Sequence, residues 1–155
     1  MAESKYGKYI IKNYLTDEEK RARGRTPDER KPGVPFPRGL LWLDEKIVKD
    51  SFYMEVVFLE PGARTTGEWV KPHTHDTHEI IGFVGTDVTN PHSLNSEVEL
   101  WLEDEKQVIT ESCLVYVPKG LKHGPLTFVK VGTPIVHFSV LTGGQYLWTD
   151  KSGPG

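Results

Sequence analysis

The sequence predicts an all-β fold: a sandwich or barrel of short antiparallel strands that follows an N-terminal arm with one short helix. Three observations carry this prediction. Apolar or alternating runs rich in Val, Ile, Phe, Tyr and Trp recur about every ten residues from residue 39 onward. Turn-forming residues separate these runs, and no long helical pattern interrupts them. Strands with this spacing are typical of antiparallel sandwiches and barrels.

The arm comprises residues 1–38, which are rich in charged residues and proline. Thr16 and Glu19 form the capping-box pattern that opens a helix, and Gly24 is suited to end it. Three prolines within residues 30–37 remove hydrogen-bond donors and exclude a regular helix or a central strand there. We therefore expect residues 1–38 to form one short helix and to pack on the barrel or on a partner subunit.

The barrel comprises residues 39–145, and residues 146–155 form a C-terminal tail. At 155 residues the chain is long enough for a single domain with its own core. The stretch 85–96 is polar and contains Asn90-Pro91, so we expect a loop there. The strands expected, in order, are 39–43, 52–59, 79–84, 98–102, 107–110, 114–117, 126–131 and 135–141.

Composition excludes several classes of function. The net charge is -3, with 19 basic and 22 acidic residues, so no basic surface for nucleic acid or anionic lipid is expected. The single cysteine, Cys113, excludes an intrachain disulfide and fits a reducing compartment. No stretch has the form of a signal peptide or is long and apolar enough to span a bilayer. We expect a cytoplasmic protein that binds neither nucleic acid nor membranes.

Three histidines and a glutamate have the spacing of one mononuclear metal site. On an extended strand His73 and His75 point to the same side, because side chains alternate between faces. Glu79 stands at the head of an apolar run, and His123 follows Pro118-Lys-Gly-Leu-Lys on a separate strand or turn. A single histidine is usually a surface or core residue, but the combined pattern favours metal ligation. Imidazole and carboxylate ligands without thiolate suit Fe, Mn, Ni, Cu or Zn as divalent ions.

These residues give the chain a resemblance to the cupin family. Cupins are small jelly-roll β-barrels, also called double-stranded β-helices, with the motifs G-x5-H-x-H-x3,4-E-x6-G and G-x5-P-x-G-x2-H-x3-N. The first motif is matched at Gly67, His73, His75 and Glu79, and the second at Pro118, Gly120 and His123. Three positions depart from the motifs: only five residues separate Glu79 from Gly85, Ser112 replaces a glycine, and Thr127 replaces the asparagine.

The resemblance covers roughly residues 40–141 and implies both a fold and a chemistry. It implies an antiparallel jelly-roll barrel with His73, His75, Glu79 and His123 holding one divalent transition-metal ion inside. Such an ion can be Fe(II) in a dioxygenase, or Mn, Zn or Ni acting as a Lewis acid in a lyase, isomerase or decarboxylase. In each case the substrate is a small organic molecule that chelates through oxygen. The alternative is a non-catalytic module that binds a metal or a small ligand.

Further candidate residues follow from position alone. His137, Tyr116 and Tyr53 are the candidates for proton transfer, although the two tyrosines also suit a barrel core. His78 adjoins Glu79 and should point to the opposite face, and His92 lies in the expected loop. Whether His78, His92 or His137 reaches the metal site stays open at this point. The proline-rich arm and the edge strands, together with the family resemblance, lead us to expect a homodimer.

Overall fold

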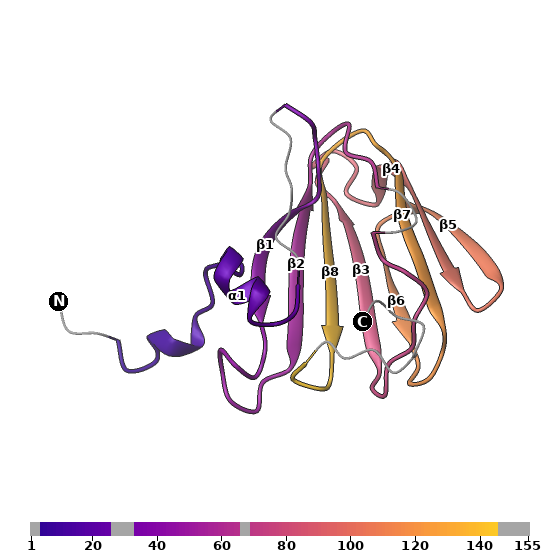
Figure 1. Ribbon diagram of the computed structural model, residues 1–155. Helices are drawn as coiled ribbons and strands as arrows, with labels where there is room; N and C mark the ends of the chain where they lie inside the picture. Colours follow the sequence, from indigo (N-terminus) through magenta and orange to yellow (C-terminus); the bar gives the residue numbers. More distant parts are fainter. Residues whose placement is uncertain (1–3, 26–32, 66–68, 146–155) are drawn as a thin grey trace.

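A computed structural model describes residues 4–25, 33–65 and 69–145 of the chain (Figure 1). Eight strands lie in these ranges and form two antiparallel sheets, which confirms the all-β prediction. The strands are β1 (Arg38–Leu43), β2 (Tyr53–Leu59), β3 (Glu79–Gly85), β4 (Ser93–Leu102), β5 (Glu105–Glu111), β6 (Cys113–Val117), β7 (His123–Val131) and β8 (Ile135–Leu141).

The two sheets pack as a double-stranded β-helix sandwich. One sheet has five strands in the order β1-β2-β8-β3-β6, and the other has three in the order β5-β4-β7. The last strand, β8, lies between β2 and β3, so the two ends of the barrel sequence are neighbours in space (Figure 1). The expected jelly-roll architecture is therefore confirmed.

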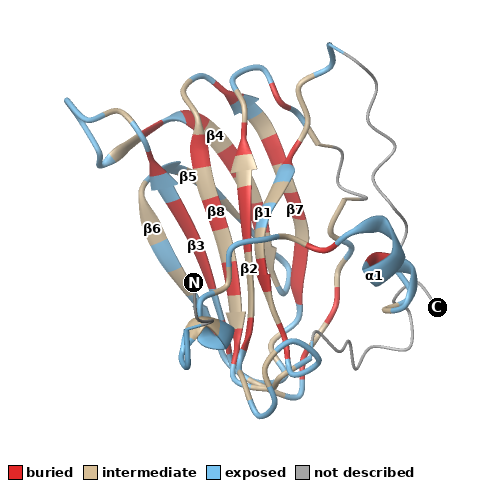
Figure 2. Ribbon diagram, turned by 90° about the vertical axis from the view of Figure 1, so that its left-hand side faces the viewer, coloured by how far each residue is buried: buried red, intermediate tan, exposed pale blue. Residues whose placement is uncertain are grey.

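The register of the five-stranded sheet decides which side chains enter the interior. Leu141 on β8 pairs with Tyr53 on β2 and with Glu79 on β3. Two residues away, Ser139 pairs with Glu55. Paired residues of antiparallel strands point to the same face, so these five side chains all point inward. Buried and more exposed positions alternate along the strands, as Figure 2 shows.

Both sheets contribute to one apolar core. Leu59, Phe83 and Ile135 come from the five-stranded sheet, and Leu100 and Phe128 come from the three-stranded sheet. Each of these side chains is at most 1% exposed. Full burial of a large apolar side chain stabilises a fold by about 1.5–3 kcal/mol, so this core fixes the spacing of the sheets.

The predicted helix is present as α1 (Asp17–Arg21). Its first turn has the capping box that the sequence predicts: the Glu19 amide donates to the Thr16 hydroxyl, and the Thr16 amide donates to the Glu19 carboxylate. Gly24 follows with a φ of 70°, a conformation that glycine adopts without strain. No helix in the described part of the chain is long and apolar enough to cross a membrane.

Residues 13–25 of the arm pack on their own barrel. The amide of Trp42 in β1 donates to the carbonyl of Asn13 at 3.1 Å, so the arm covers part of the β1 edge. Leu15 joins a small apolar cluster with Trp42, Tyr53 and Leu141. Contact between the arm and a partner subunit stays a prediction.

The expected loop is partly wrong, and the strand expected over 126–131 also begins earlier, at His123. The sequence predicts a loop over 85–96, but β4 begins within this stretch at Ser93. Leu94 and Ser96 are buried, whereas Asn95 has a φ of 47° and the β4–β5 register shifts between Ser93 and Val98. This irregularity lets polar residues enter a strand. Among the expected features, residues 26–32, Gly67 and the tail 146–155 lie outside the described residues.

Candidate metal centre

The two histidines of the first motif lie in an extended segment that precedes β3. His73 forms an isolated bridge with His123, in which each backbone amide donates to the other residue's carbonyl at 2.9 and 3.0 Å. The expectation of a regular strand at this point is wrong, because the segment forms only isolated bridges and no ladder of consecutive residue pairs. The expected alternation still holds: His73 and His75 are buried, whereas Thr74 between them is only half-buried.

The other two members come from opposite sheets. Glu79 is the first residue of β3 in the five-stranded sheet, and His123 is the first residue of β7 in the three-stranded sheet. The backbone bridge between His73 and His123 then draws the extended segment towards β7. The four side chains therefore meet between the two sheets, at the end of the sandwich where β3 and β7 begin.

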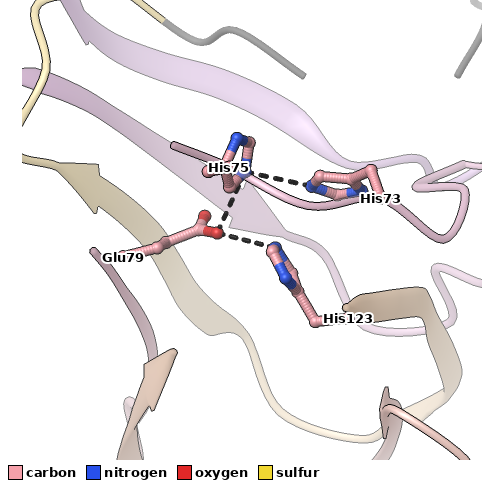
Figure 3. A group of neighbouring side chains, drawn as sticks. All are labelled: His73, His75, Glu79 and His123. Carbon is pink, nitrogen blue, oxygen red and sulfur yellow. Dashed lines mark hydrogen bonds and ion pairs between the residues drawn. The ribbon is translucent and has the colours of Figure 1, made fainter. Parts of the chain in front are cut away.

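One possible ligand atom from each of the four residues lies within 4.8 Å of all the others. Nε2 of His123 is 2.8 Å from Oε2 of Glu79, and Nε2 of His75 is 3.2 Å from the same oxygen. Nε2 of His73 is 3.1 Å from Nε2 of His75. All four side chains are at most 3% exposed. Figure 3 shows the three rings and the carboxylate converging on one point.

Backbone carbonyls fix the orientation of two rings. Nδ1 of His73 lies 2.6 Å from the carbonyl of Lys71, and Nδ1 of His123 lies 2.9 Å from the carbonyl of Leu121. A carbonyl only accepts, so each ring carries a proton on Nδ1, and Nε2 is the nitrogen that faces the cluster. The ring nitrogens that face the centre of the cluster are thereby prepared to bind a cation.

Burial and the facing charges set the protonation of the cluster. Burial lowers the pKa of His73 to about 4, and the neighbouring His123 and His75 rings add to this effect. Burial alone would raise the pKa of Glu79, but the His123 and His75 imidazoles outweigh it and hold that pKa well below its usual range. Glu79 is therefore an anion at neutral pH, which is the form that a metal ligand requires.

Two atoms of the cluster lack hydrogen bonds. Oε2 of Glu79 and Nε2 of His123 are buried, and neither makes a hydrogen bond with acceptable geometry despite their short separation. A buried polar atom without a partner costs free energy, and a shared cation would satisfy both atoms at once. Three imidazole nitrogens and one carboxylate oxygen fit a divalent transition-metal ion.

Ser139 positions the glutamate from the neighbouring strand. Its hydroxyl donates to Oε1 of Glu79, the oxygen that does not face the histidines. Ser139 is 8% exposed and lies on β8, directly next to β3 in the sheet. The serine therefore holds one carboxylate oxygen and leaves the other directed at His75 and His123.

The interior also contains a second carboxylate, that of Glu55. It accepts hydrogen bonds from the hydroxyls of Tyr14 and Tyr53, the latter at 2.7 Å. Arg25 lies 3.8 Å from the same carboxylate. Tyr14 and Arg25 belong to the arm, so Glu55 joins the arm to the inner face of β2. Sequence analysis missed Glu55, Tyr14, Arg25 and Ser139, although a charged residue at an inward position of the run 53–59 was a usable signal for Glu55.

The structure places the three proton-transfer candidates in different surroundings. His137 is buried in the aromatic core, stacked on Phe83 at 5.0 Å, with Nδ1 3.1 Å from the carbonyl of Gly82. Burial lowers its pKa. Tyr53 is fully buried, and its hydroxyl donates a hydrogen bond to Glu55. Tyr116 is 59% exposed on the outer face of β6, so the structure does not bring it to the cluster.

The two remaining histidines lie away from the cluster. His78 is exposed, as its position next to Glu79 predicts, and its Nδ1 lies 2.8 Å from the hydroxyl of Tyr116. The amide of Lys119 donates to the same nitrogen at 3.1 Å. His92 is exposed at the rim, where its carbonyl accepts from the Ser112 amide.

The chain has a cupin fold: a double-stranded β-helix, here with a buried cluster of three histidines and one glutamate between its sheets. The cupin resemblance of the two motifs is thus confirmed at the level of the fold. No protein-family profile matches the sequence, and no curated protein does either.

Solved structures do match the chain. KdgF from Halomonas sp. is 18% identical with a TM-score of 0.42, and the match covers 77% of this chain and 86% of that one. A point mutant of Bacillus subtilis oxalate decarboxylase OxdC is 16% identical with a TM-score of 0.48, covering 83% of this chain and 30% of that one. A double-stranded β-helix protein from Klebsiella pneumoniae is 15% identical with a TM-score of 0.45, covering 79% and 90%.

Proposed function

We propose that the chain is a metal-dependent cupin enzyme that acts on a small organic substrate with metal-chelating oxygen atoms. One divalent transition-metal ion (Fe, Mn, Zn or Ni) would be held by His73, His75, Glu79 and His123. The observation that supports this most is the convergence of four buried ligand atoms within 4.8 Å, with two of them lacking any hydrogen bond. Four protein ligands leave coordination positions for substrate, because these metals accept five or six ligands.

The chain's own residues have defined roles in this proposal. Burial of the four ligands keeps bulk water away, which strengthens electrostatic interactions at the site. Ser139 keeps Glu79 oriented, and the carbonyls of Lys71 and Leu121 keep their two rings oriented. A bound iron(II) ion would supply oxidative chemistry with dioxygen, whereas manganese, zinc or nickel would supply Lewis-acid polarisation of a carbonyl or carboxylate.

His137 is a candidate proton acceptor in this proposal. Its ring is neutral at physiological pH because burial lowers its pKa, so it can take up a proton and has none to donate as an imidazolium. Its buried position inside the sandwich is compatible with that role, whereas Tyr116 on the outer surface is not. Tyr53 would act through Glu55, to which its hydroxyl donates.

Elemental analysis of protein prepared anaerobically tests the metal site. We expect about one equivalent of a divalent transition metal in the wild type, and its loss in His75→Ala and His123→Ala. His78→Ala and His92→Ala are the matched controls, because both histidines are exposed and lie away from the cluster. These controls should keep the metal. If the wild type holds no metal and takes up none on reconstitution, the proposal fails.

Substrate class is tested by calorimetry on the loaded protein. We expect 2-hydroxy acids, 2-oxo acids or vicinal diols to bind the wild type and not His75→Ala, because chelation needs the ion. Turnover of a bound compound, lost in the same variant, would support an enzyme. Binding without turnover across these classes would favour the alternative, a non-catalytic ligand-binding cupin. Activity that survives removal of the metal would contradict the catalytic proposal.

A further inference from the structure

The outer face of the five-stranded sheet is apolar from β2 to β6. In β8 and β3, the outward positions alternate with the inward ones. They hold Phe138, Gly82 and otherwise only aliphatic residues. β2 contributes Met54, Val56 and Phe58, and β6 contributes Leu114 and Tyr116. None of these outward positions is charged.

The outer face of the three-stranded sheet carries charged residues. Glu99 on β4 lies opposite Val108 on β5, and Glu97 lies opposite Lys130 on β7. Lys106 forms an ion pair with Glu99 at 2.8 Å. Charges of both signs therefore cover this face, as is usual for a sheet that faces water on one side. The outer face of the three-stranded sheet is thus charged, whereas that of the five-stranded sheet is apolar from β2 to β6.

The exposed residues of the apolar face present about half of the area that one partner contributes to a standard interface. Four of its residues are exposed by 37% to 66%: Ile80, Val84, Leu114 and Tyr116. With side-chain areas on the order of 200 Å², these four alone present roughly 400 Å². The half-buried residues of β2 and β8 extend the patch towards the roughly 800 Å² per partner that a standard interface buries. Contiguous apolar patches above a few hundred Å² usually mark interaction sites.

We propose that this face, called the β2–β6 face, is the interface of a homodimer of this chain. A two-fold contact packs the same surface of both copies together, so the face has to be complementary to itself, and a charge buried in it would need a partner of opposite sign on the same face. The β2–β6 face carries none, and it is therefore compatible with itself. Twisted sheets also pack face to face at about 10 Å with interdigitating aliphatic and aromatic side chains. A second copy needs no other complementary surface.

This interface differs from the arm-mediated contact that the sequence suggested. Asn13, Leu15 and Arg25 of the arm engage their own barrel at β1 and β2. The β2–β6 face lies on the outer side of the same sheet and is built from strands alone. Dimer formation through it would leave the inward-facing metal cluster in place, so the proposal does not depend on the proposed catalytic function.

Sedimentation velocity across a concentration series tests the interface. The wild type should sediment as a dimer at micromolar concentration. Val84→Lys and Leu114→Lys should each raise the dissociation constant at least 100-fold, because each puts a charge into the apolar contact. Both positions are exposed, at 41% and 66%, so the variants should fold, with a far-UV circular dichroism spectrum like that of the wild type.

Val108→Lys is the matched control. Val108 is 55% exposed, but it lies on the outer face of the three-stranded sheet. Its substitution should leave the dimer intact. A wild type that stays monomeric at 100 µM would overturn the proposal, as would a dimer that persists unchanged in both Val84→Lys and Leu114→Lys. Dissociation by Val108→Lys with retention in the other two would move the interface to the other sheet and likewise refute it.

Discussion

Replacing Ser139 with alanine should weaken metal binding without removing a ligand. The Ser139 hydroxyl donates to Oε1 of Glu79, and this contact fixes the carboxylate so that Oε2 faces His75 and His123. Without it, Oε1 becomes a buried acceptor with no partner from β8, and the carboxylate gains rotational freedom. Both effects disfavour the arrangement that a metal ion needs.

The expected loss of metal affinity follows from the role of Ser139, which does not bind the metal itself but hydrogen-bonds to the proposed ligand Glu79. Loss of a hydrogen bond to a ligating group typically lowers metal affinity about 10-fold to 100-fold. That range corresponds to about 1.4–2.7 kcal/mol of binding free energy. Ser139→Ala should therefore retain the metal at high concentration and lose it to a chelator that the wild type resists. Glu79→Gln, which removes the ligand charge itself, should have a larger effect.

Competition titration against a chromophoric chelator measures the change directly. The matched control is Ser96→Ala, because Ser96 is also 8% exposed and hydrogen-bonded, but its hydroxyl donates to the carbonyl of Leu94 in the other sheet. This control should bind metal like the wild type even if its thermal stability falls. Equal affinity of Ser139→Ala and the wild type would refute the positioning role that we assign to Ser139.

Three further predictions concern stability. Asp44→Ala should lower the free energy of unfolding by about 3 kcal/mol in denaturant titration, because it breaks the nearly buried 2.6 Å pair with Arg23. The control is Asp76→Ala, which removes an exposed ion pair and should change the free energy of unfolding by less than about 0.5 kcal/mol. Burial opposes ionisation of Asp44, but Arg23 outweighs the effect of burial and lowers the pKa of Asp44. The stabilisation by this pair should therefore be complete at neutral pH and disappear as the pH falls below about 4. Below that pH, urea titrations of the wild type and Asp44→Ala should give the same free energy of unfolding. Gly82→Ala would drive its Cβ into the ring of Phe138, and calorimetry should show a melting temperature several degrees lower, because overpacking costs about 1–3 kcal/mol.

The four clustered residues could be predicted because their spacing is mostly local. Alternation alone places His73 and His75 on one side of an extended chain, even though the segment is not a regular strand. Glu79 follows after one short turn. His123 is distant in sequence, and the combined pattern of ligand-type residues together with the cupin resemblance linked it to the others before the structure showed its backbone bridge to His73.

The proton-transfer candidates needed information that a single strand does not contain. Tyr116 pairs with Ile80, the outward neighbour of Glu79, so register sends it to the surface. Glu55 enters the interior because it pairs with Ser139, and its partners Tyr14 and Arg25 come from the arm. Neither the register nor the docking of the arm can be read from local pattern, which is why this second carboxylate was missed.

The difference between the two outer faces is nevertheless present in the sequence. The runs 80–84 and 135–141 are apolar or small at nearly every position, whereas 97–102 and 126–131 alternate more with polar residues. Near-continuous apolar runs are typical of sheets covered on both faces, and alternating runs are typical of sheets with one face in water. The structure shows what covers the inner face of β3 and β8, namely the three-stranded sheet. The outward residues Ile80 and Val84 are left exposed, and in the proposed dimer a copy of the same uncharged face would cover them.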